Sequence, residues 1–213
     1  MEPEPAPRRA APTDLALAVG GPLGVAESSL PGVAYVAGYA ATGSDTTVAA
    51  VIAVALALVL SVVRLVKRES PRHALSGLVG VAIAAFVAAR SGRAENFFLP
   101  GLLANAGYAA LLLGSIAVRR PLVGVVVAQL DGEGRGWRED PPRARAFTRA
   151  TWMWAALFGV RLLVQLPLYL AGAVVLLGVA KTAMGLPLFA LGLWLTWRLV
   201  RRVPATAPAV AES

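Results

Sequence analysis

Residues 48–63 read VAAVIAVALALVLSVV, an apolar stretch with no glycine, no proline and no charged residue. With its flanks it forms a segment from Thr47 to Val66, close to the length of about 20 residues that a helix needs to cross a bilayer. Across the chain, 57% of the 213 residues are apolar and only 15% are charged, whereas soluble domains average about half and about a quarter. The sequence therefore predicts an all-α, polytopic membrane protein.

Further apolar segments predict a transmembrane helical bundle of about six spans within residues 15–202. The expected spans are residues 15–41, 47–66, 74–89, 97–118, 151–178 and 184–200. Residues 119–150 are expected to form a cytoplasmic loop. Within it, the apolar residues 121–130 extend the fourth span, lie in the interface or fold back as a re-entrant segment, and the pattern leaves these alternatives open. Residues 1–14 and 203–213 are expected to be disordered tails.

Basic residues gather on one side of this topology. If the N-terminus is cytoplasmic, sixteen of the twenty lysines and arginines flank the spans on the cytoplasmic side. The positive-inside rule then predicts a multi-pass protein of the cell inner (cytoplasmic) membrane with both termini in the cytoplasm. Because these flanks account for the net charge of +8, we expect no nucleic-acid partner. Anionic lipid headgroups are the expected partners of the cytoplasmic arginines.

Two segments of the chain share one pattern. Residues 30–41 read LPGVAYVAGYAA and residues 99–110 read LPGLLANAGYAA, with Leu-Pro-Gly and Gly-Tyr-Ala-Ala at matching offsets. The predicted topology directs the first and fourth spans in opposite senses, so the pattern is typical of a three-plus-three inverted repeat. The alternative is a chance match between spans built from the same few residue types.

Polar groups inside a span are costly and are functional candidates by default. Glu27 and its neighbour Ser28 lie where glycine and proline interrupt the first span, so Glu27 is interpreted as a proton or cation site, or as an interfacial carboxylate if the span begins later. Arg161 and Gln165 share a helix face one turn apart. Arg161 must pair with an acid, a carbonyl or an anionic headgroup, and Glu27 is its most economical partner. Asn105 is expected to bond across to another helix.

Four charged residues are expected at the outer mouth, where they either recruit a solute or form solvated turns: Arg90, Arg93, Glu95 and Lys181. The chain has no cysteine and one histidine, which excludes thiolate and histidine-rich metal centres. No nucleotide-binding, zinc-protease or hydrolase motif occurs in the sequence. We therefore expect no enzyme activity, no metal and no cofactor.

Five segments carry a resemblance to a known family: residues 20–32 (GGPLGVAESSLPG), 91–108 (SGRAENFFLPGLLANAGY), 119–124 (RRPLVG), 158–169 (FGVRLLVQLPLY) and 180–188 (AKTAMGLPL). The chain resembles an actinobacterial integral membrane family catalogued as domain of unknown function 3159. That resemblance implies location and topology, and no activity. From the polar residues we expect a small-solute or ion transporter or channel-like protein. The alternative is a non-transporting protein that binds lipid or scaffolds envelope and division machinery, and the oligomeric state is left open.

Overall fold

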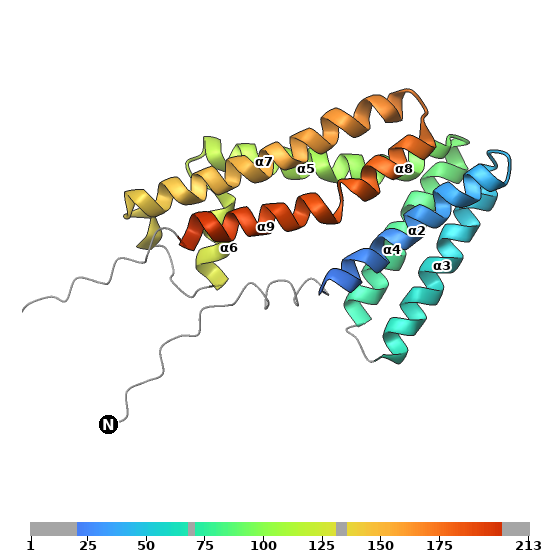
Figure 1. Ribbon diagram of the computed structural model, residues 1–213, viewed down its shortest axis with the longest axis horizontal. Coiled ribbons are helices and arrows are strands. Elements are labelled where there is room, and N and C mark those ends of the chain that lie inside the picture. Colours follow the sequence, from blue (N-terminus) through green and yellow to red (C-terminus); the bar gives the residue numbers. More distant parts are fainter. Residues whose placement is uncertain (1–20, 68–70, 131–135, 202–213) are drawn as a thin grey trace, which may run out of the picture. The chain divides into compact units, whose positions relative to one another are not determined.

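The structure is a computed structural model that describes residues 21–67, 71–130 and 136–201, with side chains described over slightly shorter ranges. Every regular element in these ranges is helical, as expected (Figure 1). The elements are α2 (Gly21–Ala41), α3 (Thr46–Val66), α4 (Pro71–Ser91), η1 (Ala94–Phe98), α5 (Leu99–Ala117), α6 (Leu122–Leu130), η2 (Gly136–Arg138), α7 (Pro141–Leu170), α8 (Val174–Ala183) and α9 (Leu186–Arg201).

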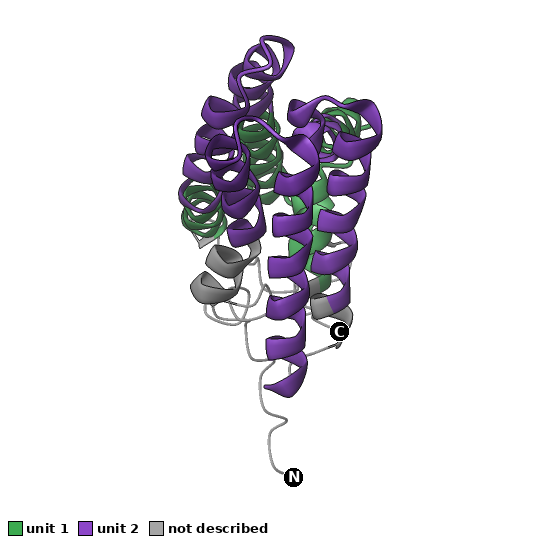
Figure 2. Cartoon of the chain, turned by 90° about the vertical axis from the view of Figure 1, so that its right-hand side faces the viewer, with its two compact units in different colours: residues 1–18, 107–158, 188–213 green, residues 19–106, 159–187 purple. Residues whose placement is uncertain are grey.

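The chain forms two compact units (Figure 2). The described part of unit 1 comprises residues 107–130, 136–158 and 188–201, and that of unit 2 comprises residues 21–67, 71–106 and 159–187. Helices α5, α7 and α9 each contribute residues to both units.

Small side chains form the helix contacts of unit 2. Helix α3 buries Ala49, Ala53 and their neighbours along one face, whereas its large residues Val51 and Val59 are 62% and 56% exposed. This arrangement inverts that of a soluble helix, because small residues allow close packing between spans while large apolar residues suit lipid. At Gly38 of α2, an added Cβ atom would lie 2.9 Å from Ile52 Cδ1 of α3.

Four stretches of helix are long and apolar enough to cross a membrane within the described residues: Thr46–Val66, Ala94–Ala117, Pro141–Leu170 and Val174–Val200. A shorter apolar stretch, Leu75–Ser91, lies in α4. The predicted membrane character is therefore supported, whereas the predicted count of six spans is not confirmed.

The helices do not follow the predicted boundaries of the last two spans. The expected fifth span, residues 151–178, contains the end of α7 at Leu170 and the start of α8 at Val174. Between these helices Gly172 has φ +65°, a left-handed conformation that glycine adopts without steric cost and that commonly ends a helix. The expected sixth span, residues 184–200, is only the second part of the apolar stretch Val174–Val200.

The predicted cytoplasmic loop, residues 119–150, is largely helical. It contains α6, η2 and the first ten residues of α7, which begins at Pro141. Proline is favourable in the first turn of a helix because it lacks the N–H group that would otherwise go unpaired. After α5 ends at Ala117, Arg119 has φ +55° and the chain turns before α6, so residues 121–130 do not extend the fourth span.

The two copies of the repeated pattern occupy different positions in their helices. Leu30 is the tenth residue of α2, whereas Leu99 is the first residue of α5. The matched tyrosines also differ, since Tyr39 packs against the core of unit 2 while Tyr108 is 54% exposed. The inverted repeat is not confirmed.

Gly178 of α8 lies so close to α2 that we expect any added side-chain atom to destabilise unit 2. A Cβ atom at this position would overlap the side chain of Val36 in α2 and lie 3.6 Å from Phe98 Cζ. Gly178→Ala should therefore lower the free energy of unfolding by about 1–3 kcal/mol, measured as a lower melting temperature in detergent. Gly32→Ala in α2 is the control, because no atom lies within 4 Å of its added Cβ; equal destabilisation of both variants would contradict this packing.

Candidate functional site

Arg161 of α7 binds the end of α8. Its Nη2 atom donates hydrogen bonds to the carbonyl oxygens of Met184, at 2.6 Å, and Gly185, at 2.7 Å. Helix α8 ends at Ala183 and α9 begins at Leu186, so these carbonyls lie in a break within the apolar stretch Val174–Val200. Carbonyls freed at a helix end need a partner where water is scarce, and the guanidinium supplies it.

Two further polar residues lie on the helices that form this contact, Gln165 on α7 and Lys181 on α8. Gln165 lies one turn after Arg161 on α7 and is 4% exposed. Lys181 lies in the last turn of α8, and its place at the outer mouth stays a prediction. The Lys181 ammonium is 5.2 Å from the centroid of the Phe98 ring, a cation–π distance. Unit 2 therefore holds two cations close to the end of α8.

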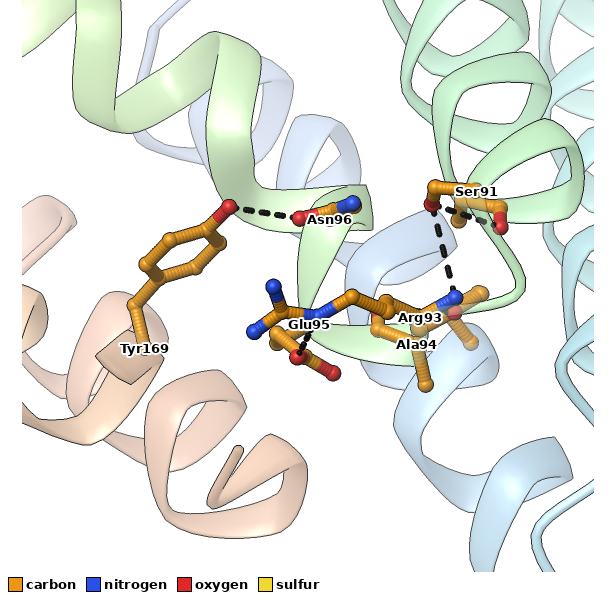
Figure 3. Close-up of polar contacts among 8 residues, drawn as sticks. Ser91, Arg93, Ala94, Glu95, Asn96 and Tyr169 are labelled. Atoms are coloured by element: carbon orange, nitrogen blue, oxygen red, sulfur yellow. Dashed lines mark hydrogen bonds and ion pairs between the residues drawn. The ribbon is translucent and has the colours of Figure 1, made fainter. Parts of the chain in front are cut away.

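A second polar cluster surrounds η1 (Figure 3). Arg93 Nε donates to Glu95 Oε1 at 2.7 Å, and the Glu95 side chain is 11% exposed. The hydroxyl of Tyr169, near the end of α7, donates to Asn96 Oδ1 at 2.5 Å. All five residues of η1 are buried. A buried carboxylate is costly unless it is paired, so Arg93 stabilises the charge that η1 carries into unit 2.

Tyr35 of α2 contacts η1 through both its hydroxyl group and its ring. Its hydroxyl donates to the carbonyl of Ala94 at 2.9 Å, and its ring stacks on Phe97 with centroids 3.9 Å apart. Tyr35 is fully buried. The sequence pattern does not single out Tyr35 or Tyr169, because neither tyrosine stands at a matched position of the repeat.

The structure brings together only part of the predicted site. Arg93 and Glu95 form an ion pair, whereas Arg90 is exposed at the end of α4. Among the described side chains, Asn105 makes no hydrogen bond to Arg161 or Gln165, although it is half-buried on α5. The predicted positions Glu27 and Ser28 lie in α2, but their side chains are outside the described ones. The pairing of Glu27 with Arg161 therefore stays a prediction.

No metal centre is evident in the described part of the chain, where no three histidine, cysteine or acidic side chains gather in a way that could hold an ion. The polar groups that do gather are guanidinium, ammonium, amide and phenol groups, with one carboxylate. Such groups bind and orient polar solutes through hydrogen bonds and charge.

Long apolar helices with large exposed side chains define the class: a helical membrane protein. Residues 19–207 match the family described as protein of unknown function DUF3159. The chain belongs to this family, as its motifs predicted. No curated protein and no solved structure matches the chain.

Proposed function

We propose that this protein moves a small solute or ion across the membrane and that the break between α8 and α9 is part of the path. The observation that carries the proposal is the pair of backbone carbonyls, Met184 and Gly185, held by Arg161 inside an apolar stretch. Discontinuous helices with exposed backbone groups form the binding sites of many secondary transporters. Charged residues in a span most often serve a pathway.

Arg161 and the carbonyls at the break between α8 and α9 could each exchange one binding partner for another. The end of α8 carries partial negative charge on its carbonyls, and Arg161 covers it. A cation that bound those carbonyls would release the guanidinium, and an anion that bound the guanidinium would release the carbonyls. Glu27, at its predicted position in the first span, is the acid proposed to receive Arg161 in the second state.

The test is flux through purified protein in liposomes. The probes are Na⁺, K⁺ and Cl⁻ under an imposed gradient, with a protonophore so that compensating H⁺ movement is followed by an entrapped pH-sensitive dye; H⁺, with a K⁺ ionophore for compensation; and glycerol, followed by light scattering. We expect wild-type protein to dissipate at least one gradient. The absence of flux for every probe, with folded protein in the liposomes, would favour the alternative of a non-transporting protein that binds lipid or scaffolds envelope machinery.

Two variants test whether any flux depends on the break between α8 and α9. Arg161→Lys keeps the charge but replaces a planar donor with a point charge, and Lys181→Met removes the second cation. We expect each to change the rate by about tenfold or more, which corresponds to about 1.4 kcal/mol. Lys67→Gln, at an exposed lysine that follows α3 and lies outside the break, is the control. Equal rates for wild type, Arg161→Lys and Lys181→Met would contradict the role of the break.

A further inference from the structure

Helix α6 is fixed in unit 1 by side chains of its two neighbours. The backbone N–H of Leu122 donates to Ser115 Oγ of α5 at 3.1 Å, and that of Val123 donates to Thr151 Oγ1 of α7 at 3.3 Å. Thr151 is fully buried. The first N–H groups of a helix lack partners within it, so these bonds hold the start of α6 in place.

Close packing holds the middle of α6. At Gly124 an added Cβ atom would lie 2.9 Å from both Phe147 Cβ and Trp137 Cη2. The rings of Trp137 and Phe147 meet edge to face, with centroids 5.1 Å apart, and Ala128 of α6 completes this cluster. The position of α6 is therefore determined by its contacts within the unit.

Helix α6 runs across the direction of α5 and α7 (Figure 1). Those two helices belong to stretches that are long and apolar enough to cross a membrane, so a helix that crosses them lies parallel to the membrane plane. Its sequence, LVGVVVAQL, contains no charge. The side of α6 away from the cluster exposes Val126, at 48%, together with the uncharged Gln129. Such a helix is suited to the boundary between headgroups and acyl chains.

Exposed arginines precede and follow this apolar helix in the sequence. Arg119 and Arg120 directly precede α6 and are both exposed. Arg138 follows it, with its guanidinium carbon 5.4 Å from the centroid of the Trp137 ring, and Arg145 and Arg149 are exposed on the first turns of α7. Among the described residues from 119 to 149, five arginines and one acidic residue, Glu139, are exposed. The surface thus combines an apolar centre with excess positive charge.

We propose that α6 lies in the membrane–water interface and that, with Arg119, Arg120 and Arg138, it forms a docking surface for anionic phospholipid headgroups. The arginines attract the phosphate groups through their positive charge, and Val126 contacts the acyl chains. A nucleic acid would match the charge but not the exposed valine. This surface lies in unit 1, and the inference does not depend on the proposed transport.

The experiment uses the full chain in a nonionic detergent. Phosphatidylglycerol is titrated against phosphatidylcholine, and native mass spectrometry measures the lipid concentration at half-saturation. We expect phosphatidylglycerol to bind about tenfold more tightly or better. The double variant Arg119→Gln/Arg120→Gln should weaken that binding by about fivefold for each arginine removed. The variant Arg119→Lys/Arg120→Lys should retain most of it, and added salt should weaken it.

Matched controls distinguish lipid binding at this surface from general electrostatic attraction to the protein. Arg90→Gln, which removes an exposed arginine of unit 2, should leave binding unchanged, and Val126→Asp should weaken it more than Val126→Ala. Equal binding of the two lipids, or equal loss in Arg90→Gln and in the double glutamine variant, would overturn the proposal. Displacement of the lipid by inorganic phosphate at the same concentration would also overturn it, because it would indicate a site for a free anion.

Discussion

Tyr35→Ala is expected to lower the free energy of unfolding by about 3–5 kcal/mol, the range for removal of a large buried aromatic side chain. Tyr35 is fully buried, stacks on Phe97 and meets Phe98 edge-on with centroids 6.1 Å apart. Its loss leaves a cavity between α2 and η1, and it also leaves the carbonyl of Ala94 without its hydrogen bond. Thermal unfolding in detergent, followed by circular dichroism, measures the change.

Tyr35→Phe separates the two contributions. It keeps the ring contacts and removes only the hydroxyl, so we expect a loss of about 1–3 kcal/mol for the unsatisfied carbonyl. Tyr108→Ala is the matched control, because that tyrosine is 54% exposed and its removal creates no comparable cavity. A Tyr35→Ala variant as stable as Tyr108→Ala would contradict the stacked core of unit 2.

The clearest helices could be predicted from composition, and their limits depend on local chemistry. The segment 47–66 matches α3 because apolar residues fill it and Asp45 accepts hydrogen bonds from the backbone of Thr47 and Val48, which marks its start. The turn after Leu170 could not be predicted in the same way. Its glycine lies between apolar residues, so hydropathy continues across it while the backbone reverses.

The candidate site, too, could be predicted from the sequence only in part. Arg161 could be singled out from sequence, because a charge in an apolar stretch is conspicuous. Its observed partners could not, since they are backbone carbonyls of residues 23 and 24 positions away, and a carbonyl has no residue-type signal. Tyr169 and Asn96 lie 73 positions apart, and their contact depends on packing that only the fold reveals.

Arg161→Met is expected to lower the free energy of unfolding by about 3 kcal/mol or more. The substitution keeps much of the apolar stem and removes two charge-assisted hydrogen bonds, each worth about 1.5–3 kcal/mol. The carbonyls of Met184 and Gly185 lose these donors within an apolar stretch, where water cannot readily replace them. The melting temperature in detergent should fall accordingly, and Arg161→Lys should fall between Arg161→Met and wild type.

A double-mutant cycle with Glu27→Gln separates the carbonyls from the predicted acidic partner. If the carbonyls account for most of the stabilisation, Arg161→Met costs nearly the same free energy with Glu27 or with glutamine at position 27, and this is the result we expect. A coupling energy well above the error of about 0.5 kcal/mol for independent sites would instead assign the main role to an ion pair between α2 and α7. If Arg161→Met keeps both the stability and the flux of wild type, neither the carbonyls nor Glu27 is an important partner of Arg161.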